Sequence, residues 1–199
     1  MTVDLRDTKR ALRRGLQARR RAVPAERAAA AAAACTSLLL AEPALRGAKR
    51  VGLYAALRDE LPTRPLFEAL GELGLERLLP RCTPGRHLEF VPVARWEELR
   101  PGRYGVSEPP PNAAPEALGP GDWVLVPGVA FDRQGWRLGR GAGYYDRTFE
   151  SPGGPRRVGL GYAFQLLTAV PHDSHDRPLD AIVTEREWLW AAPREGVGE

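Results

Sequence analysis

Apolar and polar positions near the start of the chain repeat with a helical period. Over residues 4–21, a turn of about 100° per position places three leucines on one stripe, namely Leu5, Leu12 and Leu16. Pro24 suits the first turn of a second helix, which continues through an alanine-rich stretch to about residue 40. The pattern predicts a helical segment over about 4–46 that packs on the rest of the chain.

Short apolar runs separated by turn residues follow this segment. They predict strands over 50–57, 76–82, 88–94, 123–126, 156–164 and 181–184. Helical patterns lie between them, over 63–73, 96–99 and from 144 to about 149. The proline- and glycine-rich stretch 101–121 is expected to form a long ordered loop, and the chain beyond Trp190 to be frayed. Alternating strands and helices predict one α/β domain over 1–199, with a mostly parallel sheet and helices on both faces.

Composition excludes few classes of function. The net charge of +4 permits an anionic ligand or nucleic acid but selects neither. We expect Cys35 and Cys82 to be reduced packing residues of a cytoplasmic protein, since they share no metal-ligand spacing. The sequence shows no signal-peptide pattern and no run of about 18 apolar residues, so no membrane span is expected.

The most distinctive segment is RLGRGAGYYDR at 137–147, which follows the strand at 123–126. Glycines alternate along it with arginines between them, and a helix is predicted to start at Tyr144. Glycine backbone, a helix N-terminus and arginine side chains all favour phosphate. The segment is not a Walker A loop, because it has no Gly-Lys followed by serine or threonine. It is not a dinucleotide motif either, because Tyr144 stands where the last glycine or alanine should be. It predicts a phosphate-binding turn of an unusual type; the alternative is a flexible, arginine-rich surface loop.

Cations on the first helix form two sets. Arg10, Arg14 and Arg21 point away from the leucine stripe and form a solvated face. The other set, Lys9, Arg13 and Arg20, lies within about 60° of Leu16, beside positions that should be buried. Cations there need a partner. Two explanations remain open: they snorkel or pair with carboxylates, or they face a bound polyphosphate.

Carboxylates occur at two further places. Glu60 lies just beyond a strand's C-terminal end, where α/β sheets bind ligands, although a carboxylate at a helix start is the alternative. The turn VPHDSHD holds two histidines and two aspartates, but without the helical spacing of a zinc site. One aspartate from this turn, together with Asp146 after the glycine-rich loop, better suits magnesium. No spacing supports covalent catalysis by a serine or cysteine triad.

Four segments together resemble the 5-formyltetrahydrofolate cyclo-ligase (methenyltetrahydrofolate synthetase) family. They are KRALR at 9–13, YAALRDELPT at 54–63, VPGVAFDRQGWRLGRGAGYYDR at 126–147, and the closing GLGYAFQ and LDAIVTE. The resemblance covers nearly the whole chain. It implies conversion of 5-formyltetrahydrofolate, with ATP and magnesium (Mg2+), into 5,10-methenyltetrahydrofolate, ADP and phosphate. It also implies an α/β sandwich similar to sugar-phosphate isomerases and CoA-transferases.

The resemblance further implies roles for single residues. ATP contacts would come from Lys9, Arg13, Arg137, Leu138, Gly139, Arg140, Gly141, Ala142, Gly143, Tyr144 and Tyr145. The folate pocket would hold Tyr54, Ala55 and Glu60, together with Arg140 and Tyr144. Asp146 and Asp176 would bind magnesium, and Arg137, Arg140 and Tyr144 would be catalytic. In the family, many relatives carry glycine or lysine at the position of Ala142, and the position of Arg140 varies.

The expected partner is thus a small-molecule substrate, 5-formyltetrahydrofolate, with neither nucleic acid nor membrane, in a monomer or weak dimer. Two other functions are alternatives. An RNA-binding module could use the basic first helix, although the sequence has no RNP-like aromatic pattern. A sugar-phosphate isomerase of similar fold would not consume ATP.

Overall fold

A seven-stranded sheet forms the centre of the molecule, as the computed structural model describes it over residues 4–150 and 153–192. Its strand order is β12-β11-β9-β6-β1-β2-β3. The bounds are β1 Arg50–Gly52, β2 Glu76–Cys82, β3 Leu88–Pro92, β6 Trp123–Pro127, β9 Arg156–Leu160, β11 Ala181–Val183 and β12 Trp188–Trp190. The strands from β11 to β2 run parallel, while β12 and β3 pair antiparallel at the two edges. The predicted α/β class with a mostly parallel sheet is confirmed.

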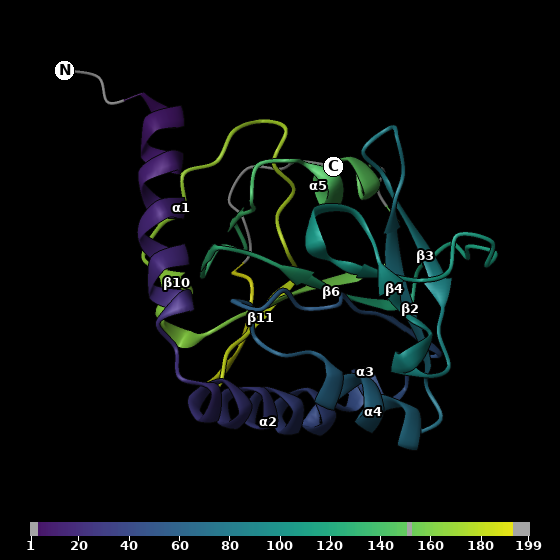
Figure 1. Cartoon of the computed structure of the whole chain (residues 1–199). Coiled ribbons are helices and arrows are strands. Elements are labelled where there is room, and N and C mark those ends of the chain that lie inside the picture. The colour runs from purple at the N-terminus through teal and green to yellow at the C-terminus, as the bar shows by residue number, and fades with distance from the viewer. Residues whose placement is uncertain (1–3, 151–152, 193–199) are drawn as a thin grey trace.

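Helices lie around this sheet (Figure 1). Their bounds are α1 Leu5–Arg21, α2 Ala25–Ala41, α3 Pro43–Arg46, α4 Arg64–Glu72 and α5 Tyr144–Thr148. Helices α2, α3 and α4 cover one face, α5 lies over the other, and α1 stands along one side (Figure 1). Helix α1 begins at Leu5 because the Asp4 carboxylate accepts a hydrogen bond from the backbone N–H of Arg6. No helix among the described residues is long and apolar enough to cross a membrane.

Two small sheets were not predicted. Strands β7 Ala130–Asp132, β8 Arg137–Leu138 and β10 Leu166–Leu167 form one, and β4 Arg100–Pro101 with β5 Ser107–Glu108 forms the other. Three short 3-10 helices complete the elements: η1 Trp96–Glu98, η2 Arg103–Gly105 and η3 Ala163–Gln165. The stretch expected to be one long loop therefore contains a hairpin. Its strands are too short to give a period in the sequence.

The predicted strand over 50–57 is wrong in length, since β1 ends at Gly52. Beyond it, the Leu53 N–H still donates to the Leu78 carbonyl, but side-chain bonds then replace the strand ladder. The Thr63 hydroxyl donates to the Tyr54 carbonyl at 2.5 Å and accepts from the Ala56 N–H at 3.3 Å. Residues 53–55 thus stay buried although the strand has ended. The expected frayed tail falls largely on 193–199, outside the described residues.

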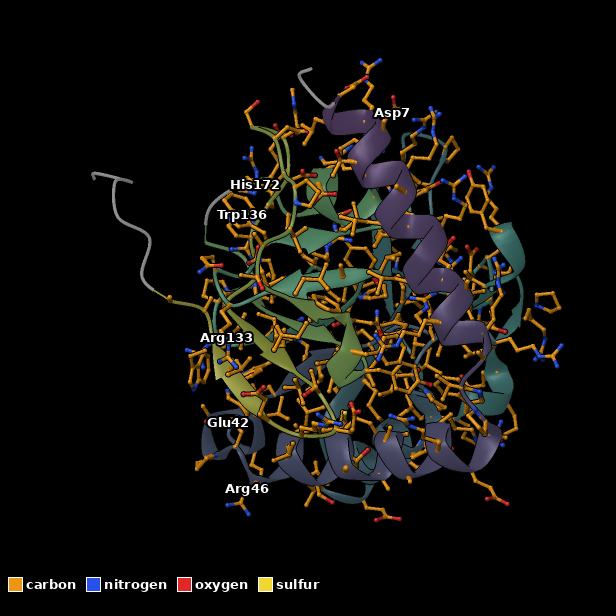
Figure 2. All side chains as sticks on the ribbon, turned by 90° about the vertical axis from the view of Figure 1, so that its left-hand side faces the viewer. Asp7, Glu42, Arg46, Arg133, Trp136 and His172 are labelled. Carbon is orange, nitrogen blue, oxygen red and sulfur yellow. The ribbon has the colours of Figure 1, made fainter. Side chains whose placement is uncertain are left out.

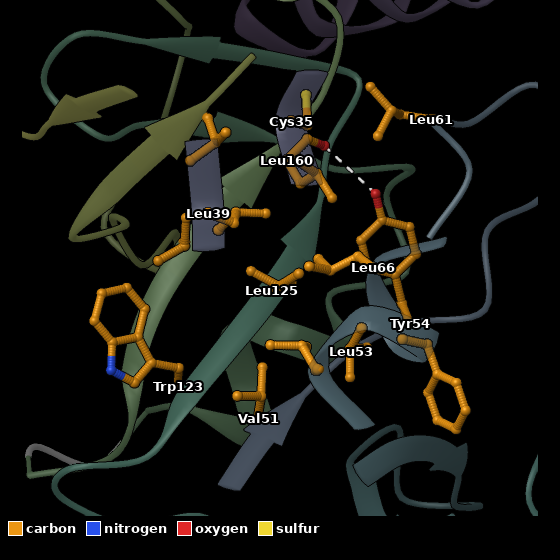
Figure 3. Packing of buried hydrophobic residues seen from close by; sticks show 14 of the residues in the cluster. Cys35, Leu39, Val51, Leu53, Tyr54, Leu61, Leu66, Trp123, Leu125 and Leu160 are labelled. Carbon is orange, nitrogen blue, oxygen red and sulfur yellow. Dashed lines mark hydrogen bonds between the residues drawn. The ribbon is translucent and has the colours of Figure 1, made fainter. Parts of the chain in front are cut away.

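Alternate side chains of the central strands enter two apolar clusters, one on each face. On the helix-covered face, Leu125 and Leu160 pack with Cys35 and Leu39 of α2 (Figure 3). On the other face, Phe131 of β7 joins Val124 and Val126. A Cβ placed on any of three glycines would lie within 2.8 Å of the Phe131 ring, namely Gly128, Gly159 and Gly161. These glycines let the small sheet approach the large one closely.

Candidate active site

A cavity of about 950 Å³ opens at the carboxyl ends of β1, β2 and β6. Ligands bind at this edge of parallel sheets. Every residue predicted for a site lines this cavity: Lys9, Arg13, Tyr54, Ala55, Glu60, Arg137, Leu138, Gly139, Arg140, Gly141, Ala142, Gly143, Tyr144, Tyr145, Asp146 and Asp176. The fold thus brings together segments of α1, the chain after β1, the glycine-rich loop and the turn around 173–176.

Lys9 and Arg13 form one wall of the cavity. The Lys9 Nζ lies 2.9 Å from Asp173 Oδ2 and 2.8 Å from Asp176 Oδ2. Burial lowers the pKa of Lys9, but hydrogen bonds with Asp176 and Asp173 outweigh this effect and raise it overall. Arg13 Nε donates to the Gly139 carbonyl at 2.8 Å. The pairing explanation is confirmed for Lys9, while contact with a polyphosphate remains a prediction.

The glycine-rich loop runs from β8 to α5, across residues 139–143. Gly141 has φ +104° and Gly143 has φ +70°, values that side chains disfavour. A Cβ on Gly139 would lie 2.6 Å from Arg137 Nη1. The loop therefore needs glycine both for its backbone angles and for close contact with an arginine. The Arg147 guanidinium donates to the Ala142 carbonyl and fastens the far end.

Arg137 is the most buried cation lining the cavity, with 6% of its side chain exposed. Its Nη2 lies 3.0 Å from both carboxylate oxygens of Asp146, and its Nη1 donates to the Pro127 carbonyl at 3.3 Å. The guanidinium lies 5.7 Å from the centre of the Tyr145 ring. These contacts fix both Arg137 and the carboxylate at the start of α5.

The two predicted magnesium ligands face the same cavity, and a cation is paired with each. Asp146 binds Arg137 and accepts from the Arg177 N–H, while Asp176 binds Lys9. Within residues 4–150 and 153–192, no three potential metal-binding side chains gather in one place. Two carboxylates suit a hard cation that keeps waters and phosphate oxygens as further ligands. The donor set is compatible with magnesium.

The histidines of the same turn have other surroundings. The His172 ring stacks on Trp136, with ring centres 3.7 Å apart and planes 6° apart (Figure 2). Its Nδ1 lies 3.0 Å from the Val170 carbonyl oxygen. His175 is exposed, and its Nδ1 lies 3.6 Å from Asp173 Oδ1. The stack ties this turn to the small sheet.

A second wall of the cavity holds aromatic and apolar side chains. Burial raises the pKa values of Tyr54 and Tyr145, so both hydroxyls are neutral at physiological pH. The Tyr54 hydroxyl donates to the Leu160 carbonyl at 3.5 Å, and its ring belongs to the core cluster (Figure 3). Tyr54 therefore packs in the core and lines the cavity at once. Glu60 accepts from the Leu57 N–H at 3.0 Å, which closes a turn rather than capping a helix.

Sequence reasoning missed one side of the cavity. Cys82, Tyr104, Val106 and Glu108, from β2 and the β4–β5 hairpin, also line it. Tyr104 has φ +57° and an edge-to-face contact with Tyr144, at 6.2 Å between ring centres. Burial, and then Glu108, raises the pKa of the Cys82 thiol to about 11, which keeps it protonated and unreactive. The motif PGRYG was the one local signal that could have drawn attention to Tyr104.

The sequence profile of the 5-formyltetrahydrofolate cyclo-ligase family matches residues 6–185. The chain belongs to this family. Among its relatives, the 5-formyltetrahydrofolate cyclo-ligase of Escherichia coli K12 is 32% identical over 88% of this chain and 100% of the relative. That of Mus musculus is 28% identical over 92% of this chain and 96% of the relative. The resemblance drawn from the sequence is confirmed.

Solved structures agree. The 5,10-methenyltetrahydrofolate synthetase of Aquifex aeolicus is similar with a TM-score of 0.80 and 30% identity, over 96% of both chains. The chain is therefore an enzyme of the cyclo-ligase family, and this membership argues against a dedicated RNA-binding module. The expected similarity to sugar-phosphate isomerases remains a prediction.

Proposed function

We propose that this cyclo-ligase family member converts 5-formyltetrahydrofolate and ATP into 5,10-methenyltetrahydrofolate, ADP and phosphate. One observation carries the proposal: a single cavity is lined by a cationic wall, by an aromatic wall and by the glycine-rich loop. A polyphosphate suits the first wall and a flat ring system the second. Their shared cavity lets the two substrates meet.

The nucleotide would lie along Lys9, Arg13 and the loop 137–145. Glycines permit close approach of the backbone, and arginines bind phosphate oxygens at fixed angles. Lys9 already holds two carboxylates, so a phosphate would compete for or share an ammonium that is in place. Ala142 offers no charged side chain, so the surrounding arginines would supply the positive charge.

The folate would lie against Tyr54, Ala55, Glu60 and Tyr144. Neutral tyrosines provide flat apolar faces for a pterin ring. Glu60 and Arg140 both line the cavity, and Glu60 Oε1 accepts from Arg140 Nε at 3.2 Å. They would orient the formyl group toward the phosphates.

In the proposed reaction the formyl oxygen attacks the γ-phosphorus and ADP leaves. The neighbouring folate nitrogen then attacks the activated carbon and loses its proton, the ring closes, and phosphate leaves with the former formyl oxygen. The enzyme needs no nucleophile of its own, because catalysis rests on positioning and on neutralising charge. Arg137, Arg140 and Tyr144 would do this, with Arg137 held in place by Asp146.

Magnesium would be held by Asp146 and Asp176, both of which line the cavity. When bound, it would neutralise phosphate charge. Both carboxylates would have to exchange or share their present partners, Arg137 and Lys9.

The test is an absorbance assay for 5,10-methenyltetrahydrofolate formed from 5-formyltetrahydrofolate, run with and without ATP and magnesium. We expect product only when both are present. Absence of product under those conditions would overturn the proposal. ATP-independent turnover of a sugar phosphate by the same protein would favour the isomerase instead.

A further inference from the structure

An ion-pair network joins a buried arginine of α1 to the glycine-rich loop. Arg20, in the last turn of α1, has only 1% of its side chain exposed. Its Nη2 and Nε donate to Asp59 Oδ2 at 2.5 and 3.2 Å, and its Nη1 donates to the Gly128 carbonyl at 3.1 Å. All three groups of this guanidinium are therefore engaged in the protein interior.

The Asp59 carboxylate uses its second oxygen for another arginine. Asp59 Oδ1 accepts from Arg140 Nη2 at 2.7 Å, and Glu60 Oε1 accepts from Arg140 Nε at 3.2 Å. Glu60 Oε1 also lies 3.8 Å from Arg20 Nη2. Two adjacent carboxylates thus connect a buried arginine of α1 with an arginine of the loop. Arg140 and Glu60 line the cavity.

The network can fix the orientation of the Arg140 side chain, which the loop alone cannot fix. Arg140 stands between Gly139 and Gly141, and glycines leave the backbone many conformations. Its long side chain adds further rotamers. Arg20 has neither freedom, because it is buried, permanently charged and must keep its partner. Because Arg20 holds the Asp59 carboxylate in place, Asp59 in turn restricts the side chain of Arg140.

We propose that Arg20 and Asp59 are positioning residues that hold Arg140 and Glu60 in the orientation these side chains present to the substrates. Neither Arg20 nor Asp59 acts on the reacting atoms. The kinetic part of this inference rests on the proposed function, whereas its structural part concerns the ligand-free protein.

The chain provides a matched control. Arg50 and Asp122 form a second forked pair, with Nε–Oδ1 3.2 Å and Nη2–Oδ2 2.6 Å. Asp122 is buried and precedes β6, at the opposite end of the strand from the cavity. Asp59→Asn and Asp122→Asn therefore remove equivalent charges, one behind the loop and one away from it.

The first experiment uses ligand-free protein and trypsin, which cleaves after arginine. The rate of cleavage between Arg140 and Gly141 is measured by mass spectrometry. Asp59→Asn should raise this rate about tenfold, because it frees the side chain and the loop that carries it, while Asp122→Asn should leave it near that of wild type. Equal rates in wild type and Asp59→Asn, or an equal rise in Asp122→Asn, would overturn the proposal.

The second experiment is kinetic. We expect Asp59→Asn to lower kcat/KM by about tenfold or more, mainly through kcat, because Arg140 would no longer be correctly oriented toward the substrates. A merely structural role would lower the melting temperature and leave kcat of the folded enzyme unchanged, as expected for Asp122→Asn.

If Asp59→Asn does not fold, both experiments are carried out with Arg20→Lys instead. Lysine keeps the positive charge but lacks the several donors of a guanidinium. We therefore expect faster cleavage after Arg140 and a lower kcat, both smaller than in Asp59→Asn. Unchanged cleavage and kcat in Arg20→Lys would overturn the proposal. A wild-type protein that forms no product would overturn the proposed function, while the trypsin experiment, which needs no substrate, would still decide the positioning role.

Discussion

At the scale of single residues, three cations that line the cavity already have partners in the protein. Lys9 binds two carboxylates, Arg13 a carbonyl and Arg137 a carboxylate. Because an unpaired charge in a partly buried place is costly, these partners keep the cations in position before a substrate arrives. A phosphate then meets side chains whose orientation is already set.

We expect Lys9→Ala to raise KM for ATP about tenfold or more and KM for folate much less, since an ammonium–phosphate contact is lost. Steady-state kinetics with each substrate varied would measure both. Lys49→Ala, which removes the other lysine of the chain, is the control and should change neither. An effect confined to folate would reassign this wall of the cavity.

Asp146→Asn should shift the magnesium titration of activity to about tenfold higher concentration, because a charged oxygen ligand becomes neutral. Asp173→Asn is the control, since Asp173 also lines the cavity and pairs with a cation, Lys9, but is not a predicted ligand. Identical magnesium curves for wild type and Asp146→Asn would remove Asp146 from the proposed metal site.

At the scale of elements, helix α1 and the glycine-rich loop work together. One face of α1 sends Lys9, Arg13 and Arg20 inward, while Arg10, Arg14 and Arg21 are exposed as predicted. The loop folds against that inward face, with Gly141 next to the Arg13 guanidinium. The helix therefore supplies both charge and a rigid support for a flexible segment.

Gly141→Ala should lower kcat/KM about tenfold or more, because φ +104° is disfavoured for alanine and the loop must move. Gly74→Ala is the control: its φ is +76°, and nothing lies within 4 Å of an added Cβ. Both substitutions should cost about 1 kcal/mol of stability, measured by chemical unfolding. Equal activity in the two variants would contradict a special role for the loop conformation.

On the scale of the whole molecule, Phe131 joins the small sheet to the large one. Its ring is fully buried against Gly128, Gly159 and Gly161. Phe131→Ala should lower the free energy of unfolding by about 3–5 kcal/mol, measured by urea denaturation. Leu73→Ala, at an exposed position, should change it by less than about 0.5 kcal/mol. A similar small loss in both variants would show that the two sheets are held together elsewhere.

Acid should weaken the molecule through the same network that holds Arg140. Burial alone would raise the pKa of Asp59, but Arg20 and Arg140 outweigh it and hold this pKa below 3.8. A carboxylate with a lowered folded-state pKa stabilises fully above its unfolded pKa, and the contribution disappears as pH falls through the folded value. The stability difference between wild type and Asp59→Asn should therefore shrink below about pH 4. A difference independent of pH would contradict the pairing.

The sequence by itself determined the class of fold, the N-terminal helices and the glycine-rich loop of the cavity. Periodicity located α1, a proline followed by an alanine-rich stretch located α2, and local chemistry selected the glycine-rich loop. These features are encoded within short segments, so spacing and residue type reveal them. The inward direction of Lys9 and Arg13 was also readable, because it follows from helix geometry alone.

Only the tertiary structure decided which charges meet and what closes the cavity. The contact between Arg20 and Asp59 joins residues 39 positions apart, and that between Arg140 and Asp59 joins residues 81 apart. The β4–β5 hairpin, which brings Tyr104 to the cavity, has strands too short to leave a period. Which distant residues form ion pairs depends on how the sheets and helices pack, and the local sequence pattern does not reveal it.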